Sequence, residues 1–174
     1  MKHFILTLIL FGLLVSEGVA LELLPESIIN LSSVIVPHWL LIFLVLINFF
    51  YEEDKSYIFI IYAIIFGLLV DIVYTDILGV YMFAYGIALF VSTILKRILQ
   101  ENIIMAILTG ILSIITAEAI ISGVYSIIDV INVYWLDNLV DRLFPTIIAN
   151  VVFLIVIYPI VKYIFSKYSN ESYN

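Results

Sequence analysis

Six long apolar stretches divide this chain, and they constrain its fold more than any other feature. They cover residues 4–21, 34–51, 57–74, 77–95, 103–128 and 143–165. Each approaches the roughly 20 residues that an α-helix needs to cross a hydrocarbon core about 30 Å thick. Lipid-embedded segments must satisfy their own backbone hydrogen bonds, and the alternation typical of a barrel is absent. We therefore predict an all-α integral membrane protein with six transmembrane helices, forming one domain over residues 1–174.

The basic residues between these stretches predict the orientation of the helices. Of the seven Lys and Arg residues, only Arg142 lies in an odd-numbered gap. The other six lie at the chain ends or in even-numbered gaps: Lys2, Lys55, Lys96, Arg97, Lys162 and Lys167. Short segments rich in Lys and Arg stay in the cytoplasm during insertion, whereas acidic residues contribute little. Both termini are therefore predicted to be cytoplasmic.

The composition excludes several classes of function. Hydrophobic residues make up 65% of the chain and charged residues 12%, and the mean hydropathy is +1.25, so a water-exposed surface of ordinary size cannot be built. The chain has no cysteine, which excludes disulfides, thiol catalysis and cysteine-based metal sites. Its two histidines, His3 and His38, lie far apart in sequence. We predict no catalytic residue, cofactor, metal site or nucleic-acid partner.

The first stretch has an alternative interpretation as a signal peptide. Lys2 precedes an apolar run, and small residues follow at Gly18 and Ala20, as before a signal-peptidase site. Cleavage there would leave five spans. Glu17 is unfavourable beside such a site, and retention keeps both termini on the basic side of the membrane. We therefore expect the first span to be retained.

Ionisable and polar residues inside the spans are the candidates for a functional site, because hydrocarbon makes them costly. The set comprises Glu17, His38, Asp71, Glu118 and Asn150, with Arg142 at the start of the last span. In the predicted topology, Glu17, His38, Asp71 and Arg142 share one layer of the outer leaflet. They form either a polar cavity or partner site that opens outward, or pairs that fix helix order, Glu17 with His38 and Asp71 with Arg142.

Two further features bear on interactions. Glu118 falls near the middle of the membrane and shares a helix face with Ser122 and Tyr125, so it is either protonated and hydrogen-bonded across helices or in contact with a polar group of a partner. The same span carries a stripe of small residues, at which another helix backbone can approach closely, inside the protein or from a partner. The stripe consists of Ala106, Gly110, Ser113 and Ala117. The segment 129–142 is predicted to form a short amphipathic helix at the headgroups.

The third and fourth spans carry a recognisable motif. Residues 66–71 read FGLLVD, and residues 76–81 read DILGVY, followed by Ala84 and Tyr85. This order resembles the central signature of the bacterial rod shape-determining MreD family. The proline-led second span and the last span are also similar. The resemblance identifies Pro37, Gly67, Asp71, Leu78, Gly79, Tyr85, Asn150 and Pro159 as signature positions. Asp71 or Asp76 can accept hydrogen bonds from the free N–H groups that open the fourth span.

The resemblance implies a non-enzymatic subunit of the cell-wall elongation machinery in the bacterial plasma membrane. Proteins of this family bind MreC, and through it a RodA-type glycosyltransferase and its transpeptidase partner. Homodimerisation stays open. The candidate partner face is the small-residue stripe. The family commonly has an acid after the second-span proline, where this chain has His38. That difference argues against a carboxylate function at this position.

Two rival functions come from other classes. The substrate-binding subunits of energy-coupling-factor vitamin transporters resemble this chain in size and helix count, and such a protein would use the outer polar layer as its ligand pocket. An intramembrane aspartyl protease needs two acids in Tyr-Asp and Gly-x-Gly-Asp contexts. Asp71 lies instead in Leu-Val-Asp-Ile, which argues against a protease.

Overall fold

The computed structural model describes residues 2–23, 35–50, 56–99, 102–128 and 142–171. These residues form six α-helices and no strand. The helices are α1 (Lys2–Leu23), α3 (Trp39–Phe50), α4 (Ser56–Tyr74), α5 (Val80–Lys96), α6 (Ile103–Ile127) and α8 (Phe144–Glu171). The all-helical prediction is thereby confirmed for the described residues.

Three helices are long and apolar enough to cross a membrane, over Tyr57–Tyr74, Ile103–Ile127 and Phe144–Ile164. The others are shorter apolar helices, over Phe4–Ala20, Trp39–Phe50 and Val80–Lys96. The predicted second span, 34–51, is wrong as a continuous helix. Residues 35–38 are not helical, and α3 has only 12 residues.

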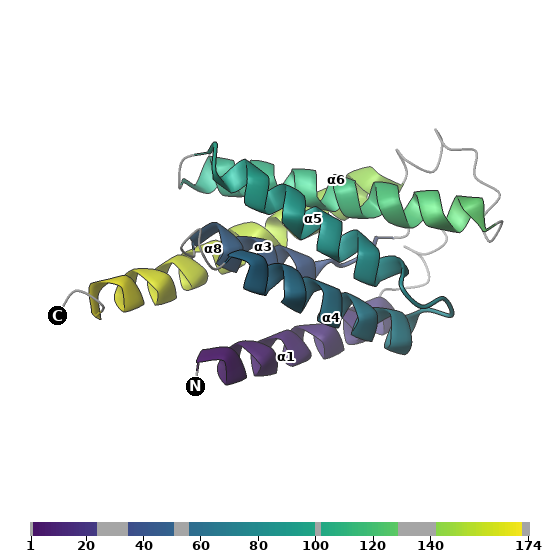
Figure 1. The fold of residues 1–174 in the computed structure, drawn as a ribbon, viewed down its shortest axis with the longest axis horizontal. Helices are drawn as coiled ribbons and strands as arrows, with labels where there is room; N and C mark the ends of the chain where they lie inside the picture. The colour runs from purple at the N-terminus through teal and green to yellow at the C-terminus, as the bar shows by residue number, and fades with distance from the viewer. Residues whose placement is uncertain (1, 24–34, 51–55, 100–101, 129–141, 172–174) are drawn as a thin grey trace.

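The helices run along a common direction as a bundle in which α1 begins and α8 ends at the same end (Figure 1). We call this the Lys96 end, because α5 finishes there. At the opposite end α3 and α5 begin, and we call it the His38 end. Consecutive helices α4, α5 and α6 pack side by side in antiparallel order. The His38 end therefore collects the residues at which α1, α4 and α6 finish and α3, α5 and α8 start.

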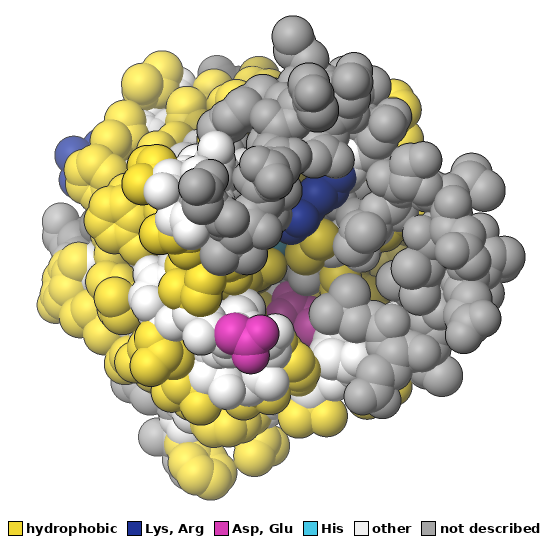
Figure 2. Space-filling view, turned by 90° about the vertical axis from the view of Figure 1, so that its right-hand side faces the viewer, with side chains coloured by type: hydrophobic (Ala, Val, Ile, Leu, Met, Phe, Trp, Pro, Cys, Tyr) yellow, Lys and Arg dark blue, Asp and Glu magenta, His cyan; other side chains and the backbone are white. Residues whose placement is uncertain are grey.

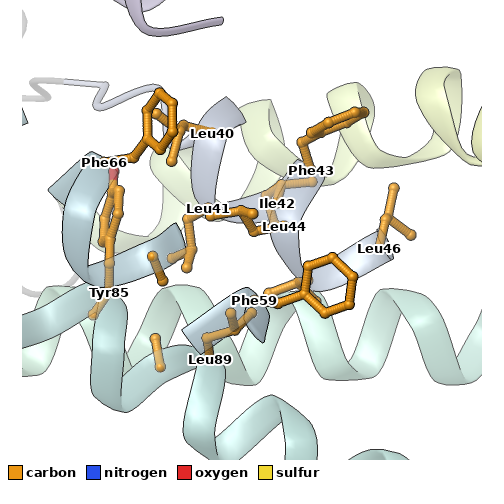
Figure 3. Close-up of a cluster of buried hydrophobic side chains, with 14 of the residues drawn as sticks. Leu40, Leu41, Ile42, Phe43, Leu44, Leu46, Phe59, Phe66, Tyr85 and Leu89 are labelled. Atoms are coloured by element: carbon orange, nitrogen blue, oxygen red, sulfur yellow. The ribbon is translucent and has the colours of Figure 1, made fainter. Parts of the chain in front are cut away.

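The short helix α3 forms the centre of the bundle. It contacts every other helix, and its residues from Leu40 to Phe49 are all buried. Leucine and isoleucine side chains of α3 pack against Phe59 and Phe66 of α4 and against Tyr85 and Leu89 of α5 (Figure 3). The sequence of α3 has no charged residue and is apolar on all faces except for Asn48, which suits a helix with neighbours on all sides.

The other helices present large apolar side chains to the surroundings. Examples are Phe4 in α1, Ile104 in α6 and Val156 in α8, with 74%, 69% and 63% of their surface exposed. Monomeric soluble proteins rarely carry apolar surfaces of this extent, whereas lipid tails cover them at no cost. The surface is therefore that of a membrane protein, as the composition predicted.

Candidate functional site

A short non-helical segment, residues 35–38, precedes α3 inside the protein, and side chains of α8 bond to its backbone. The Val36 N–H donates to Thr146 Oγ1 at 3.2 Å, and the His38 N–H donates to Asn150 Oδ1 at 2.7 Å. The Asn150 amide in turn donates to the Val36 carbonyl at 2.9 Å. Non-helical backbone is tolerated at membrane depth only where protein groups satisfy it. These bonds explain why the apolar helix α8 carries a buried asparagine at position 150.

His38 directly precedes α3, and its ring bonds to residues of α5 and α6. Its carbonyl accepts the first helical bond, from Ile42, so the helix begins directly after Pro37 and His38, as the resemblance implies. Its Nε2 lies 2.9 Å from Glu118 Oε1 in α6, and its Nδ1 lies 2.9 Å from the Tyr85 hydroxyl in α5. Each ring nitrogen of His38 therefore has one polar partner, and the tautomer decides which nitrogen donates. His38 is fully buried.

Glu118 also faces a cation. Arg142 Nε lies 3.2 Å from Glu118 Oε2, and Arg142 Nη2 lies 3.5 Å from Oε1. The carboxylate is almost fully buried, whereas 29% of the arginine side chain is exposed. Arg142 therefore forms the accessible edge of the group, and Glu118 its interior. Figure 2 shows basic and acidic side chains on the face of the molecule at the His38 end. Of the two interpretations of Glu118, the structure supports a bond across helices.

Glu17 caps a neighbouring helix rather than pairing with a cation. Its Oε1 accepts the Leu40 N–H at 2.7 Å, and its carboxylate also accepts from Trp39, the first residue of α3. The first N–H groups of a helix lack intrahelical partners and carry partial positive charge, which favours a carboxylate there. The predicted Glu17–His38 pair is therefore wrong, because His38 turns its ring to α5 and α6.

Asp71 performs the same task for α5. Its Oδ2 accepts from the N–H groups of Gly79 and Met82, at 2.9 and 3.0 Å, and its Oδ1 accepts from Tyr81 at 2.9 Å. Gly79 occupies the N-cap with φ of 99°, a left-handed conformation that favours glycine and leaves no side chain for capping. The expectation that Asp71 or Asp76 accepts hydrogen bonds from the N–H groups that open the fourth span is confirmed for Asp71. Its predicted pairing with Arg142 is wrong, since three backbone N–H groups occupy the carboxylate.

The remaining signature residues have separate local roles. A Cβ at Gly67 would lie 2.6 Å from the Tyr81 carbonyl oxygen, so only glycine lets α4 approach the backbone of α5 here. Leu78 lies in the turn between these helices with 67% of its surface exposed. Pro159 lies inside α8. Together, Gly67, Asp71 and Gly79 build one tight connection between α4 and α5.

The small-residue stripe of α6 lies inside the protein. Ala106, Gly110, Ser113 and Ala117 are all buried. A Cβ at Gly110 would lie 2.5 Å from Leu154 Cδ1 in α8 and 3.5 Å from Ile42 Cδ1 in α3. The prediction that the stripe forms a partner face is therefore wrong, because α3 and α8 cover it. The segment 129–141, with its predicted amphipathic helix, lies outside the described residues.

The polar side chains at the His38 end form hydrogen bonds to backbone groups and ion pairs with one another. They are those of Glu17, His38, Asp71, Tyr85, Glu118, Arg142 and Asn150. Within the described part of the chain, no three His, Cys, Asp or Glu side chains lie together as a metal site would require. The carboxylates of Glu17 and Asp71 already accept backbone hydrogens. Tyr85, His38 and Glu118 form a chain of two hydrogen bonds that joins α5, the start of α3 and α6.

Two groups of polar residues escaped the sequence interpretation. Thr146 bonds to the non-helical segment, and Thr75 donates to the Asp71 carbonyl at 3.0 Å within the α4–α5 turn. At the other end, Asn48, Ser92 and Thr93 are buried between α3 and α5. A polar side chain inside an apolar run is the signal that could have identified Asn48.

Comparison with known proteins gives one consistent result. A family model described as rod shape-determining protein MreD matches residues 2–168. The chain is 27% identical over 151 residues to the rod shape-determining protein MreD of Bacillus subtilis (strain 168), which covers 87% of this chain and 86% of the relative. No solved structure matches.

Proposed function

Because this chain belongs to the MreD family of rod shape-determining proteins, we propose that it is a non-enzymatic, multi-pass subunit of the cell-wall elongation machinery. In this proposal it binds MreC in the plasma membrane, and through MreC it supports a RodA-type glycosyltransferase and its transpeptidase. The family match over residues 2–168 carries the proposal, since family membership gives a role in determining cell shape. The capped and paired state of the buried carboxylates supports a structural role for them.

In the proposed topology, all six helices cross the membrane with both termini in the cytoplasm. The Lys96 end is then cytoplasmic and the His38 end extracytoplasmic. The shortness of α3 is compatible with this. Its 12 residues give about 18 Å at ~1.5 Å per residue, and the non-helical residues 35–38 can add at most about 13 Å at ~3.3 Å per residue. The sum is close to the ~30 Å hydrocarbon core.

Labelling tests this topology directly, because the chain has no cysteine. A single cysteine at Asp76, in the α4–α5 turn, should react with a membrane-impermeant maleimide added to intact cells. A single cysteine at Arg97, after α5, should react only after the membrane is opened. Labelling of both positions from outside would contradict the six-span arrangement.

We propose an MreC contact that does not lie on α6. A single-span partner docks laterally in the membrane, and the α6 stripe is covered by α3 and α8. The α4–α5 turn is an alternative with exposed apolar residues, and Asp71 of the family signature accepts hydrogen bonds from the backbone that follows it. Large apolar side chains surround it, namely Ile72, Val73, Leu78 and Phe83, each more than half exposed. We place the MreC membrane helix against this surface, at the proposed extracytoplasmic end.

Copurification from membranes in mild detergent tests the partner and the surface together. The unmodified protein should recover MreC, Leu78→Asn should recover less, and Ile98→Asn should behave as the unmodified protein. Ile98 is the matched control, since it is 76% exposed beyond the other end of α5. If the folded unmodified protein recovers no MreC, the proposed partner is wrong. A copurifying vitamin would instead support the transporter-subunit alternative.

A further inference from the structure

The central helix α3 is not enclosed equally on all sides. The other helices surround it, and neighbours pack together in the order α1, α4, α5, α6 and α8. The last two neighbours, α8 and α1, do not pack against each other in this way over the residues that the structure describes. The ring around α3 is therefore open at one junction, and the surroundings can reach α3 there.

The exposure that α3 retains lies on one face. Phe43 is 7% exposed and Ile47 is 5% exposed, whereas every other residue from Leu40 to Phe49 is at most 1% exposed. Trp39 and Phe50, at the two ends of the helix, are half-buried. Trp39, Phe43, Ile47 and Phe50 follow one another at helical spacing, so they share one face. We call these four residues the partly exposed face of α3.

Ring contacts place this face beside α8. The Trp39 ring stacks on Phe153 of α8, with ring centroids 5.3 Å apart, and the Phe50 ring lies 5.4 Å from that of Tyr158, also in α8. On another side of α3, Asn48 bonds to α5. The partly exposed face therefore follows α8 and lies at the open junction.

The side of α1 at this junction is also apolar. Phe11 of α1 packs edge-on against Phe66 of α4, so that side of α1 faces α4. Leu6 and Leu13 lie on the other side of the helix and pack against the core while staying partly buried. Apolar side chains of α1 and α8 thus border the partly exposed face.

These dimensions favour a hydrocarbon chain over a helix as the occupant. Packed helices lie about 8–10 Å apart and interlock their side chains, so a helix docked here would require broad access to Phe43 and Ile47. Their exposure of a few per cent leaves room only for a thinner occupant. An acyl chain of a lipid is apolar, unbranched and supplied by the surrounding bilayer.

A lysine lies at one end of the partly exposed face. Lys162 of α8 is exposed, and its Nζ lies 5.8 Å from the centre of the Tyr158 ring, the ring that contacts Phe50. Lys162 belongs to the last turn of the apolar stretch Phe144–Ile164, from which a lysine side chain reaches the headgroups. The described residues place no carboxylate within ion-pair distance of it. Such a lysine attracts anionic lipids.

We propose that the partly exposed face of α3 binds an anionic phospholipid, with one acyl chain between α1 and α8 along Phe43 and Ile47 and its phosphate at Lys162. The lipid chain closes the ring around α3 at the one junction where the helices do not. This inference does not depend on the proposed MreC function, and it assigns the headgroup to the Lys96 end whichever side of the membrane that end faces.

Photocrosslinking of the unmodified protein tests the position of the chain. The protein is reconstituted alone in phosphatidylglycerol vesicles that contain a phosphatidylglycerol probe with a diazirine in the middle of one chain. Mass spectrometry of the peptides should find adducts on Phe43 or Ile47 and none on Leu41 or Val45, which lie on the opposite face and are fully buried. Val156 of α8 is 63% exposed and reports ordinary contact with lipid.

Adducts on Val156 without any on α3 would overturn the proposal. If the same sample is also dimeric by mass photometry, the partly exposed face belongs to a second copy of the chain, and the lipid site is likewise excluded.

A lysine variant tests the headgroup. Lys162→Gln should lower the adduct yield on α3 about fivefold, as expected for the loss of one cation at a membrane surface, and leave the yield on Val156 unchanged. Arg97→Gln is the matched control, because Arg97 is an exposed cation at the same end of the bundle, and it should have no effect. Equal yields on α3 for the Lys162→Gln variant and the unmodified protein would overturn the assignment of the phosphate to Lys162.

Discussion

The two ends of the helix bundle solve the same problem in different ways. At the His38 end, α3 and α5 begin inside the protein, and carboxylates from other helices, Glu17 and Asp71, accept their free N–H groups. At the Lys96 end, the buried residues Asn48, Ser92 and Thr93 are neutral, and the side chain of Lys96 is also buried. The comparison shows which helix starts depend on negative charge. We expect substitutions that remove a charge at the His38 end to lower the stability strongly. Substitutions that replace a neutral polar residue at the Lys96 end should lower it only slightly.

Asp71→Asn should have the largest effect on this comparison. The substitution keeps the shape of the side chain but replaces one acceptor oxygen with an NH₂ group, which must face a backbone N–H of α5. Hydrogen bonds to charged groups contribute about 1.5–3 kcal/mol, so we expect a loss near 3 kcal/mol, or roughly 6–12 °C in melting temperature. Thermal unfolding in lipid nanodiscs measures it. Asp76→Asn, in the exposed turn, is the control and should change little.

Arg142→Leu should come next. It leaves Glu118 buried with His38 as its remaining partner. Breaking a fully buried pair costs about 3–5 kcal/mol, and partial exposure of Arg142 reduces our estimate to about 2 kcal/mol. The double variant with Glu118→Gln should recover part of this loss, since no carboxylate is then left unpaired. Strict additivity of the two effects would show that the Glu118–Arg142 pair contributes nothing.

Glu17→Gln should have a smaller effect than Asp71→Asn. The amide oxygen of glutamine can still accept the Leu40 N–H, and only the second interaction, with Trp39, is lost. We expect a decrease of about 1–2 kcal/mol in unfolding free energy. Glu17→Leu, which removes both acceptors, should cost more. Equal stability of these two variants would mean that Glu17 does not cap α3.

Thr93→Val should give the smallest change and so define the Lys96 end. It removes two neutral hydrogen bonds, one accepted from Asn48 and one donated to the Leu89 carbonyl, in a side chain of nearly the same size. The expected loss is about 1 kcal/mol, measured by the same unfolding assay. A loss as large as that of Asp71→Asn would erase the distinction between the two ends.

The sequence predicted the helices well and the polar contacts poorly. Apolar runs predicted the six helices of the described residues and most of their bounds. The non-helical residues 35–38 before Trp39 were missed, although Pro37 and His38 interrupt the apolar run there. Asp71 was assigned correctly because its partners lie within the next 11 residues. Glu17 was paired wrongly because its partner is a backbone N–H 23 residues away, and backbone groups leave no trace in a sequence. The contacts of Asn150 with residues 112 and 114 positions away escaped for the same reason.

The small-residue stripe shows a second limit. Its spacing predicts close helix approach whether the neighbour is internal or a partner. Only the positions of Leu154 and Ile42 identify the neighbour as internal. The docking surface for MreC therefore had to be reassigned from the exposed residues of the α4–α5 turn.

Amide hydrogen exchange at the two buried helix starts tests most directly whether Glu17 and Asp71 act as caps of separate helices. In lipid nanodiscs, Asp71→Asn should speed exchange about tenfold or more at residues 79–82, the start of α5, and leave residues 39–41 unchanged. Glu17→Gln should do the reverse, with a smaller increase at residues 39–41. Equal acceleration at both helix starts in either variant, or none in both, would contradict the account.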